Sequence, residues 1–515
     1  MAEVLIAGAG PTGLVLAVWL TRLGVSVRII DKLAESGTTS RALAVQARTL
    51  ELYQQVGLAR ALVDRAHKLP AVNLWVRNAC AARIPLEALG HDLSPFGFAL
   101  IFPQDEHERL LIEHLRHLGV EVERQIELRG FEDAGSHIRA RLRNADGFEE
   151  VCSVSYIAGC DGARSRVREV LNTGFPGGTY DHLFYVADVE AGGPPMNGEL
   201  HVDLDVADFL AVFPLKEAGR ARLIGTVRDE STLQTPSLRF EDVQDRAIRN
   251  LNVQVKRVNW FSTYRVHHRV AHSFRTGRAF LLGDAAHIHS PVGGQGMNTG
   301  IGDAVNLAWK LAVALRSASA GWILDSYEPE RIAFARRLVA TTDRVFTGII
   351  SPTPLARFVR TRAVPTLAPW LLRLPIVRRF VFRTVSQIAV NYRGSSLSSG
   401  MAGSVCGGDR LPWAGPVVGD GGVDNYACLE SLDWQIHVYG EPAAAMESVA
   451  LRHGIALQVF RWRQRMATAG LRCNAAYLVR PDGYVALADA QGSAAAMAAF
   501  LERNQISSLR HNARA

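Results

Sequence analysis

Three glycine-centred motifs hold the residues whose types and spacing have the clearest chemical meaning. The first, GAGPTG, spans residues 8–13, and the second, DGARS, spans residues 161–165. The third begins with GDAAH at residues 283–287 and continues with PVGGQGMN at residues 291–298. Glycines at such positions let backbone amides approach a phosphate closely. Three such motifs in this order predict a chain folded around one dinucleotide.

The first motif lies between two apolar runs. Val4–Ala7 predicts a buried parallel strand, residues 12–23 a helix with its N-terminal amides toward phosphate, and Val25–Ile30 a second strand. Asp31 then follows at the place where an acid binds a ribose hydroxyl. The alternative is a chance glycine turn in an ordinary α/β unit. The register of strand, glycines, helix and acid favours the dinucleotide site.

The other motifs are placed by predicted elements of the same kind. Val151–Ala158 predicts a strand that enters the second motif, and Arg278–Leu282 predicts one that enters the third. Met297–Arg316 predicts a long helix after the third motif. Residues 71–102 and 180–271 are rich in strand signals, so we expect a sheet-rich insert within the cofactor domain.

Composition fits an enzyme with sizeable cores: the 515 residues are 48% hydrophobic and 21% charged. The six cysteines form no Cys-x-x-Cys pair, so we expect reduced thiols in a cytoplasmic protein. Residues 4–21 are uncharged, but their glycines and proline argue against a membrane span. Five histidines fall within residues 267–289; two belong to the third motif and the others flank a strand, so we expect no metal site.

The positive charge is concentrated in one segment. Residues 344–408 contain nine arginines, no lysine and no acid, although the whole chain carries only +7. This distribution argues against a nucleic-acid binder, whose charge should follow a recognition module. Three interpretations stay open: arginines paired with acids elsewhere, steering of an anionic nicotinamide dinucleotide phosphate, and contact with an anionic membrane surface. We favour pairing and do not expect membrane contact.

Together these residues resemble the class A flavoprotein monooxygenases, the single-component, FAD-dependent aromatic hydroxylases. The likeness is greatest to the phenol and polyketide hydroxylase branch, which adds a thioredoxin-like C-terminal domain. Two further motifs, GDRLP at residues 408–412 and RPDGYVA at residues 480–486, also resemble that branch. The likeness covers nearly the whole chain and is specific for the family but not for a substrate.

The resemblance implies that all three motifs hold FAD, with the glycines of the first at the pyrophosphate. The family more often has Glu where this chain has Asp31. Pro291 and Gly293 lie on the loop that meets substrate and flavin, and they are the expected catalytic positions. Asp161 and Arg164 are tied to both FAD and nicotinamide binding. The expected cofactor-binding residues are Gly8, Gly10, Gly13, Asp31, Arg41, Gln104, Asp161, Arg164, Asp284, Gly296, Met297 and Asn298.

The implied reaction is hydroxylation of a phenolic or polycyclic aromatic substrate. NAD(P)H reduces FAD, O2 adds at flavin C4a, and the hydroperoxide delivers one oxygen atom. An FAD oxidase or dehydrogenase on the same fold, without oxygen insertion, is the alternative. Phe209, Ala211 and Phe213 share one strand face and are expected either to line an apolar pocket or to pack in the core. A homodimer is left open, and no nucleic-acid partner is expected.

The expected fold class combines α/β and α+β parts: a Rossmann-type FAD-binding domain interrupted by a sheet-rich substrate domain, then a helical segment and a thioredoxin-like domain. Residues 395–408 are rich in Ser and Gly and predict a linker at the start of the last part. Within that part, Ala475–Val479 and Tyr484–Ala488 flank the turn at residues 480–483 and predict a hairpin, and Ser493–Glu502 predicts a closing helix. The expected ranges are 1–70, 103–179 and 272–343 for FAD binding, 71–102 and 180–271 for substrate binding, 344–394 for the helical arginine-rich segment, and 395–515 for the C-terminal domain.

Overall fold

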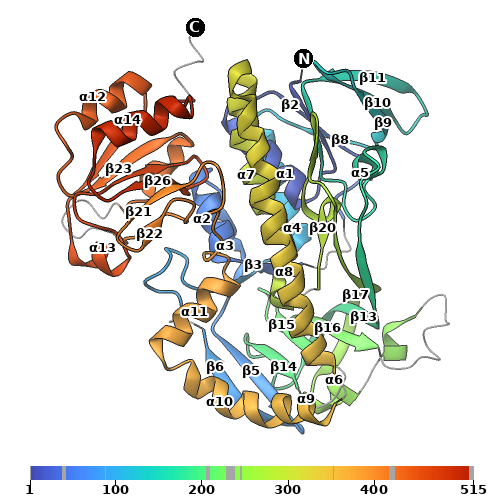
Figure 1. The fold of residues 1–515 in the computed structure, drawn as a ribbon. Coiled ribbons are helices and arrows are strands. Elements are labelled where there is room, and N and C mark those ends of the chain that lie inside the picture. The colour runs from blue at the N-terminus through green and yellow to red at the C-terminus, as the bar shows by residue number, and fades with distance from the viewer. Residues whose placement is uncertain are drawn as a thin grey trace.

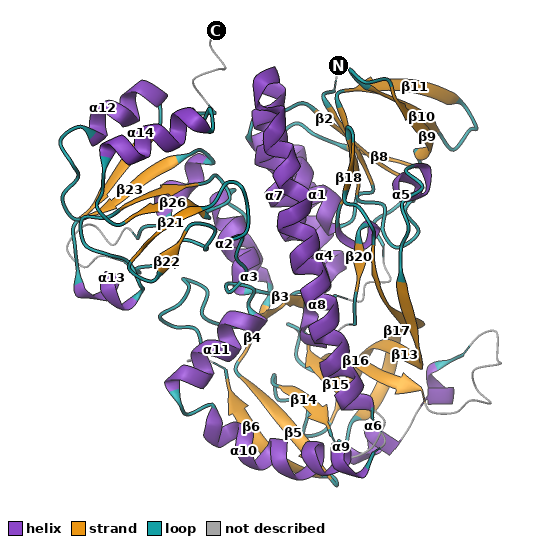
Figure 2. Ribbon diagram, viewed as in Figure 1, coloured by secondary structure: helices purple, strands orange, loops and turns teal. Residues whose placement is uncertain are grey.

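A computed structural model of the chain describes residues 2–37, 42–86, 89–204, 209–227, 238–243, 246–290, 292–351, 353–416 and 424–509 (Figure 1). Two of the predicted site residues, Arg41 and Pro291, lie outside these ranges. The expected fold class is confirmed: within the described ranges, helices alternate with strands that form five sheets (Figure 2). No described helix is long and apolar enough to cross a membrane.

A six-stranded sheet carries the first and second motifs and leads into the third, in the order β18-β19-β12-β1-β2-β8. Its neighbours pair in parallel except β18 with β19. The first strand and the helix after it confirm the sequence prediction, because β1 and most of α1 are fully buried. The strands are β1 (Val4–Ala7), β2 (Val27–Asp31), β8 (Val122–Arg124), β12 (Tyr156–Gly159), β18 (Arg275–Thr276) and β19 (Ala279–Leu281).

The single strand predicted over residues 151–158 is wrong, because the structure has two strands there. The first, β11 (Glu149–Val154), pairs with β10 (Ile138–Arg143), which pairs with β9 (Glu127–Asp133) in a separate antiparallel sheet. The amide of Ser155 donates to the carbonyl of Glu3, and the chain then continues as β12 beside β1. An apolar run that changes partners midway looks in sequence like one continuous strand.

The insert forms an eight-stranded mixed sheet in the order β20-β17-β13-β16-β15-β14-β5-β6. Two segments far apart in sequence meet in it, since β5 pairs in parallel with β14. A small sheet of β3 (Ala44–Val45), β7 (Ala99–Ile101) and β4 (His67–Leu69) lies nearby. The insert strands are β5 (Ala71–Val76), β6 (Ala79–Pro85), β13 (Gly177–Gly192), β14 (Leu200–Asp203), β15 (Leu210–Pro214), β16 (Arg220–Val227), β17 (Gln254–Val270) and β20 (His287–Ile288).

Two long helices, α7 (Gly296–Arg316) and α8 (Tyr327–Ile350), run through the centre of the molecule (Figure 1). Three shorter helices follow along one edge: α9 (Pro354–Phe358), α10 (Val364–Leu371) and α11 (Pro375–Val385), with a π-turn (Val359–Ala363) between the first two. The remaining helices of the first 300 residues are α1 (Pro11–Arg22), α2 (Ala47–Gln55), α3 (Ala59–Arg65), α4 (Gln104–His117), α5 (Arg166–Val170) and α6 (Arg246–Asn250).

The C-terminal part is a six-stranded sheet in the order β22-β21-β26-β25-β23-β24. A parallel β23-α12-β24 unit precedes the predicted hairpin β25-β26 and helix α14, the arrangement expected of a thioredoxin-like domain. The predicted linker over residues 395–408 is wrong in part, because β21 and β22 lie within it and β21 pairs with β26. The elements are β21 (Ser399–Ala402), β22 (Val405–Cys406), β23 (Gln435–Tyr439), α12 (Met446–His453), β24 (Ala456–Phe460), α13 (Gln464–Thr468), β25 (Ala476–Val479), β26 (Val485–Asp489) and α14 (Ala494–Arg503).

Candidate functional site

The turn after β1 requires glycine at two positions. Gly8 has φ +102°, and a Cβ there would stand 2.3 Å from the carbonyl oxygen of Cys160, the residue directly after β12. A Cβ on Gly13 would stand 2.0 Å from the carbonyl oxygen of Gly8. These two residues therefore let the first motif, the second motif and the start of α1 pack closely together.

Gly10 faces open space at the start of α1. It is the N-cap residue, and nothing lies within 4 Å of the point where its Cβ would stand. Gly10, Pro11 and Thr12 line a large cavity. No side chain caps the helix and its first turn contains no acid. Free first-turn amides and a positive dipole end suit an anion, as the sequence predicts for a pyrophosphate.

Asp31 ends β2 beside this turn. Its Oδ2 accepts the amide of Ala9 at 2.8 Å, and its Oδ1 accepts the amide of Leu33 at 2.9 Å. The guanidinium of Arg124 lies 3.9 Å from Oδ2. The carboxylate thus holds the glycine turn in place, and its predicted contact with a ribose remains a prediction.

The second motif lies on the loop between β12 and α5. Asp161 Oδ2 accepts the amides of Arg166 at 2.6 Å and Val167 at 3.1 Å at the start of α5. Burial raises the pKa of the Asp161 carboxyl despite these hydrogen bonds. Arg164 is exposed and forms no ion pair with any residue in the described ranges. Arg168, which the sequence prediction left out of the site, donates to the Ala285 carbonyl at 3.0 Å and so joins the second motif to the third.

The third motif turns at residues 283–285, where Asp284 is exposed and lines the cavity. Asp303 on α7 holds this turn, because its Oδ2 accepts the Gly283 amide at 3.0 Å and lies 2.7 Å from His287 Nε2. Arg331 on α8 donates to the other oxygen of Asp303 at 2.6 Å. No sequence motif marks Asp303, which lies on α7 about two helical turns after Gly296.

The N-terminus of α7 opens on the same cavity. Gly296 and Met297 line it, and α7 has neither a side-chain cap nor an acid in its first turn. The side chain of Asn298 is buried and points elsewhere: its Oδ1 accepts the Gln46 amide at 2.9 Å, and its Nδ2 donates to the Ala44 carbonyl at 2.9 Å. Asn298 therefore fixes the 44–46 segment against the helix end, and only its backbone amide is available to a ligand.

Three further polar residues lie at or near the cavity. Gln46 Nε2 donates to the carbonyl of Gly293 at 3.0 Å, which fixes the loop before α7. Gln104 begins α4, lines the cavity, and donates from Nε2 to Glu108 at 2.8 Å. His289 also lines the cavity, and burial lowers its pKa to about 4, so its ring is neutral.

The cavity has a volume of about 820 Å³. Six predicted site residues line it: Gly10, Gln104, Asp284, Gly293, Gly296 and Met297. The lining also contains many apolar and aromatic side chains, with Phe209 and Phe213 among them, whereas Ala211 between them is buried and does not line it. The aromatic residues that the sequence did not single out are Phe98, Phe184, Tyr264, Phe346 and Phe382. They come from separate elements, so no spacing in the chain could have grouped them.

The cavity and its rim suit FAD. Two uncapped helix N-termini supply amides for negative charge, and the glycine turn leaves room at Gly10 for a pyrophosphate. The volume is within the range of small-molecule sites. Within the described ranges, no three or more His, Cys, Asp or Glu side chains are grouped to hold a metal ion.

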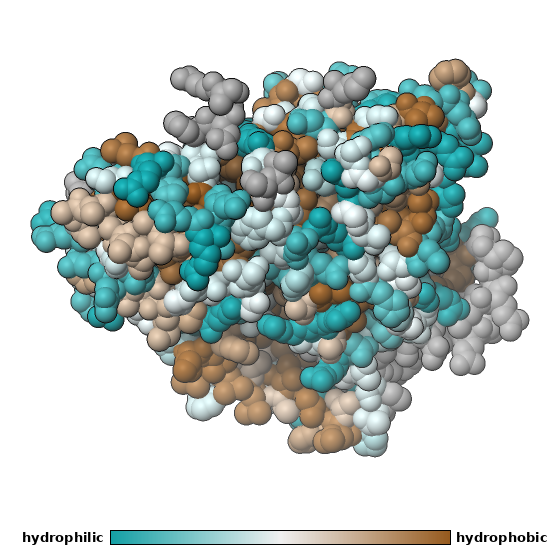
Figure 3. All heavy atoms as spheres, turned by 45° about the horizontal axis from the view of Figure 1, so that its top comes forward, coloured by the Kyte–Doolittle hydropathy of each residue, from teal (hydrophilic) through white to brown (hydrophobic). Residues whose placement is uncertain are grey.

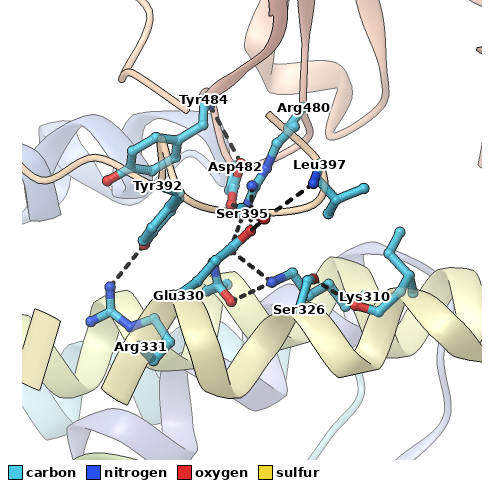
Figure 4. Close-up of polar contacts among 12 residues, drawn as sticks. Lys310, Ser326, Glu330, Arg331, Tyr392, Ser395, Leu397, Arg480, Asp482 and Tyr484 are labelled. Atoms are coloured by element: carbon cyan, nitrogen blue, oxygen red, sulfur yellow. Dashed lines mark hydrogen bonds and ion pairs between the residues drawn. The ribbon is translucent and has the colours of Figure 1, made fainter. Parts of the chain in front are cut away.

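The C-terminal domain contacts the helices α7 and α8 through buried charges (Figure 4). Arg480, from the turn before β26, contacts Glu330 on α8, and Lys310 on α7 donates to the same carboxylate at 2.8 Å. Tyr392 accepts from Arg331 at 2.8 Å. The indole rings of Trp309 on α7 and Trp434 lie 5.5 Å apart edge to face. The domain thus stabilises α8 and α7, and the N-terminus of α7 is the end of the third motif.

Comparison with known proteins gives concordant results. Residues 1–342 match the family described as FAD binding domain. The chain is 33% identical to 6-methylpretetramide 4-monooxygenase of Streptomyces rimosus, over 94% of this chain and 90% of that protein. It is 30% identical to pentachlorophenol 4-monooxygenase of Sphingobium chlorophenolicum, over 80% of this chain and 75% of that protein. The solved structure of OxyS anhydrotetracycline hydroxylase from Streptomyces rimosus is 30% identical in sequence and has a TM-score of 0.78. The match covers 97% of this chain and 98% of that one.

Proposed function

The chain belongs to the FAD-dependent aromatic monooxygenases, and from that premise we propose that it hydroxylates a polycyclic phenol held in the 820 Å³ cavity, consuming NAD(P)H and O2. The observation that carries the proposal is the make-up of this one cavity. Residues predicted to contact FAD and a set of aromatic side chains line the same cavity. A substrate ring packed against those aromatic side chains would therefore lie beside the cofactor.

FAD would be held by the uncapped N-termini of α1 and α7. We assign the pyrophosphate to the turn at Gly8, Gly10 and Gly13, and the ring system to the amides of Gly296, Met297 and Asn298. Asp284 lines the cavity between these two helix ends and would meet the ribityl or phosphate side. When bound, FAD supplies the two-electron chemistry that activates O2.

The remaining work of the site is positioning and exclusion of water. Phe184 and Phe346 pack with ring centroids 5.4 Å apart and form a rigid part of the wall. A flat aromatic substrate would be oriented by such rings, which brings its reacting carbon to one place. An apolar wall also excludes water, which protects a reactive oxygen species from wasteful decay. His289 contributes a neutral ring to this wall.

The relatives favour a polycyclic substrate over a single ring. The relatives named above act, by their names, on pretetramide, anhydrotetracycline and pentachlorophenol. These substrates share a phenolic ring, and two of the three are polycyclic. Nicotinamide would approach at the exposed Arg164 loop, where Gly162 and Ala163 reach the cavity.

The test is a screen of single-ring and polycyclic phenols for stimulated NAD(P)H oxidation, followed by the mass of each product. We expect the largest stimulation, with a hydroxylated product, from polycyclic phenols. A second arm uses Ile224→Trp, which adds bulk to the cavity wall. It should raise KM for a polycyclic phenol more than for a single-ring phenol while the FAD content stays unchanged. Stimulation without any hydroxylated product would favour the oxidase alternative.

A further inference from the structure

The helices α9, α10 and α11 carry large apolar side chains on their outward faces. On α11, Ile376 is 77% exposed and Phe380, one turn later, is 69% exposed. On α10, Leu367 and Trp370 are 50% and 58% exposed at a spacing of three residues. Residues three or four apart share one side of a helix. Each helix therefore presents an apolar stripe to the outside, the reverse of an ordinary surface helix.

These side chains form a cluster rather than a scatter. Eleven of the seventeen exposed large hydrophobic residues in the described chain lie between residues 355 and 385. Figure 3 shows brown side chains gathered along the lower edge of the molecule, where Figure 1 places α9 and α10. Single exposed apolar residues are normal, but a contiguous group indicates a contact surface. We call this the α9–α11 face; its apolar members are Leu355, Phe358, Val359, Val364, Leu367, Trp370, Leu371, Leu374, Ile376, Phe380 and Val385.

The same face is positively charged. Within the described residues, the favoured interpretation of the sequence, arginines paired with acids, is wrong for most of the nine arginines in residues 344–408. Among the described residues only Arg379, with Asp92, and Arg393, with Asp409, form ion pairs. Arg360 donates instead to backbone carbonyls. The arginines left exposed on the α9–α11 face without an acid partner in the described chain are Arg357, Arg362, Arg373 and Arg383.

We propose that the α9–α11 face docks on an anionic phospholipid surface. Helices that lie on a membrane combine exposed Trp, Phe and Leu side chains, which enter the acyl boundary, with Arg side chains at the phosphates. A second copy of the chain is a poorer partner, because a two-fold contact would set unpaired arginines against arginines. Steering of a nicotinamide dinucleotide accounts for the arginines but not for the apolar cluster.

The docked face adjoins the cavity through one helix. Val381, Phe382 and Val385 of α11 line the cavity, while Ile376 and Phe380 of the same helix point outward. Docking would place this wall beside the lipid, where an apolar aromatic compound concentrates. The docking itself does not depend on the proposed reaction, so its failure would leave the hydroxylase assignment untouched.

The experiment is vesicle flotation of the full-length, FAD-loaded protein. One set of vesicles contains phosphatidylcholine alone and the other contains added phosphatidylglycerol. We expect the protein to float with the anionic vesicles, to float much less with the neutral ones, and to be released by high salt. Light scattering of the free protein, over a range of concentrations, reports any dimer.

Two sets of variants separate the apolar and the charge contributions. The apolar set is Trp370→Ser with Phe380→Ser, and the basic set is Arg357→Gln with Arg362→Gln and Arg373→Gln. Each set should weaken association with anionic vesicles by at least about tenfold. Matched controls on the C-terminal domain are Leu451→Ser, at a leucine 75% exposed, and Arg461→Gln with Arg472→Gln, at exposed arginines.

The FAD content and turnover of a water-soluble phenol should be unchanged in every variant, which shows that the variants are folded. The proposal is overturned if the protein fails to float with anionic vesicles, or if the control variants lose association equally. A concentration-dependent dimer that the apolar set abolishes, without vesicle binding, would assign the α9–α11 face to self-association instead.

Discussion

Arg480 and Glu330 form a bidentate ion pair in the interior of the protein, 150 residues apart in sequence. Nη1 lies 2.9 Å from Oε1 and Nη2 lies 3.0 Å from Oε2, and neither side chain is more than 1% exposed. Burial alone would raise the pKa of Glu330, but Arg480 and Lys310 hold that pKa well below its usual range. A second carboxylate, Asp482, lies 2.6 Å from Arg480, so the two cations Arg480 and Lys310 face the two anions Glu330 and Asp482. The group joins the C-terminal domain to α7 and α8.

Removal of Arg480 should therefore be costly. Arg480→Gln removes the ion-pair partner of the buried Asp482 and weakens the neutralisation of Glu330, so we expect the free energy of unfolding to fall by about 3–5 kcal/mol. Chemical denaturation followed by tryptophan fluorescence measures this fall. The matched control is Arg452→Gln, which breaks the 3.9 Å pair with Glu502 between two exposed side chains and should cost less than about 1 kcal/mol. Equal losses in both variants would contradict a structural role for the buried group.

A buried histidine should make the C-terminal domain sensitive to acid. His437 is fully buried, and burial lowers its pKa to about 3 from an ordinary value near 6.5. Between these two pKa values His437 is protonated in the unfolded chain but neutral in the folded chain. Its contribution to the free energy of unfolding is therefore fully present above about pH 6.5 and is lost as the pH falls toward 3.

The expected loss from His437 alone is about 2 kcal/mol between roughly pH 7 and pH 5. Denaturation curves at the two pH values, for wild type and His437→Gln, isolate this contribution. The variant should show the smaller difference between the two pH values, whatever its absolute stability. An identical pH dependence would mean that His437 takes up its proton without unfolding.

Asp284 should matter for the cofactor and not for folding. It lines the cavity at the third motif, so Asp284→Ala should weaken FAD binding by at least about tenfold, through loss of a hydrogen-bonding carboxylate. Titration of the FAD-free protein, followed by flavin fluorescence, measures the affinity. Asp146→Ala, at an exposed turn, is the control. Unchanged affinity in Asp284→Ala would count against the assignment of this turn to FAD.

Arg164 should separate cofactor binding from cofactor reduction. A guanidinium can hold a phosphate through a planar fork that lysine lacks. We expect Arg164→Lys to keep FAD and substrate but to be reduced by NADPH at least roughly tenfold more slowly, and to react with O2 at a normal rate after chemical reduction. Anaerobic stopped-flow absorbance decides the point. Arg166→Lys, two residues on, is the control, and equal rates in wild type and Arg164→Lys would exclude the role.

Local patterns of the sequence predicted the parts of the fold that depend on local physics. β1, α1 and the turn between them follow from an apolar run, glycines and a helix start. The same holds for the hairpin of β25 and β26, whose turn contains Gly483 with φ +75°. In each case neighbouring residues determine the structure.

Features that depend on partners far away in sequence were not predictable. The chain changes sheets at Ser155 because β1 offers a free edge to β12, and no residue near Ser155 signals it. The strand β21 (residues 399–402) pairs with β26 through backbone groups, so its Ser and Gly content wrongly predicts a linker. The pairing of Arg480 with Glu330 and the aromatic wall of the cavity arise only when separate elements meet. The exposed arginines of α9–α11 were misassigned for the same reason.

The most direct test of the proposed hydroxylation is turnover of a phenolic substrate under ¹⁸O2 in ordinary water. We expect one atom of ¹⁸O in the hydroxylated product, with one NAD(P)H oxidised per product formed and little H2O2. An oxidised product without ¹⁸O, or conversion of all the O2 to H2O2 with the substrate unchanged, would contradict it and assign the chain to flavin oxidation without oxygen insertion.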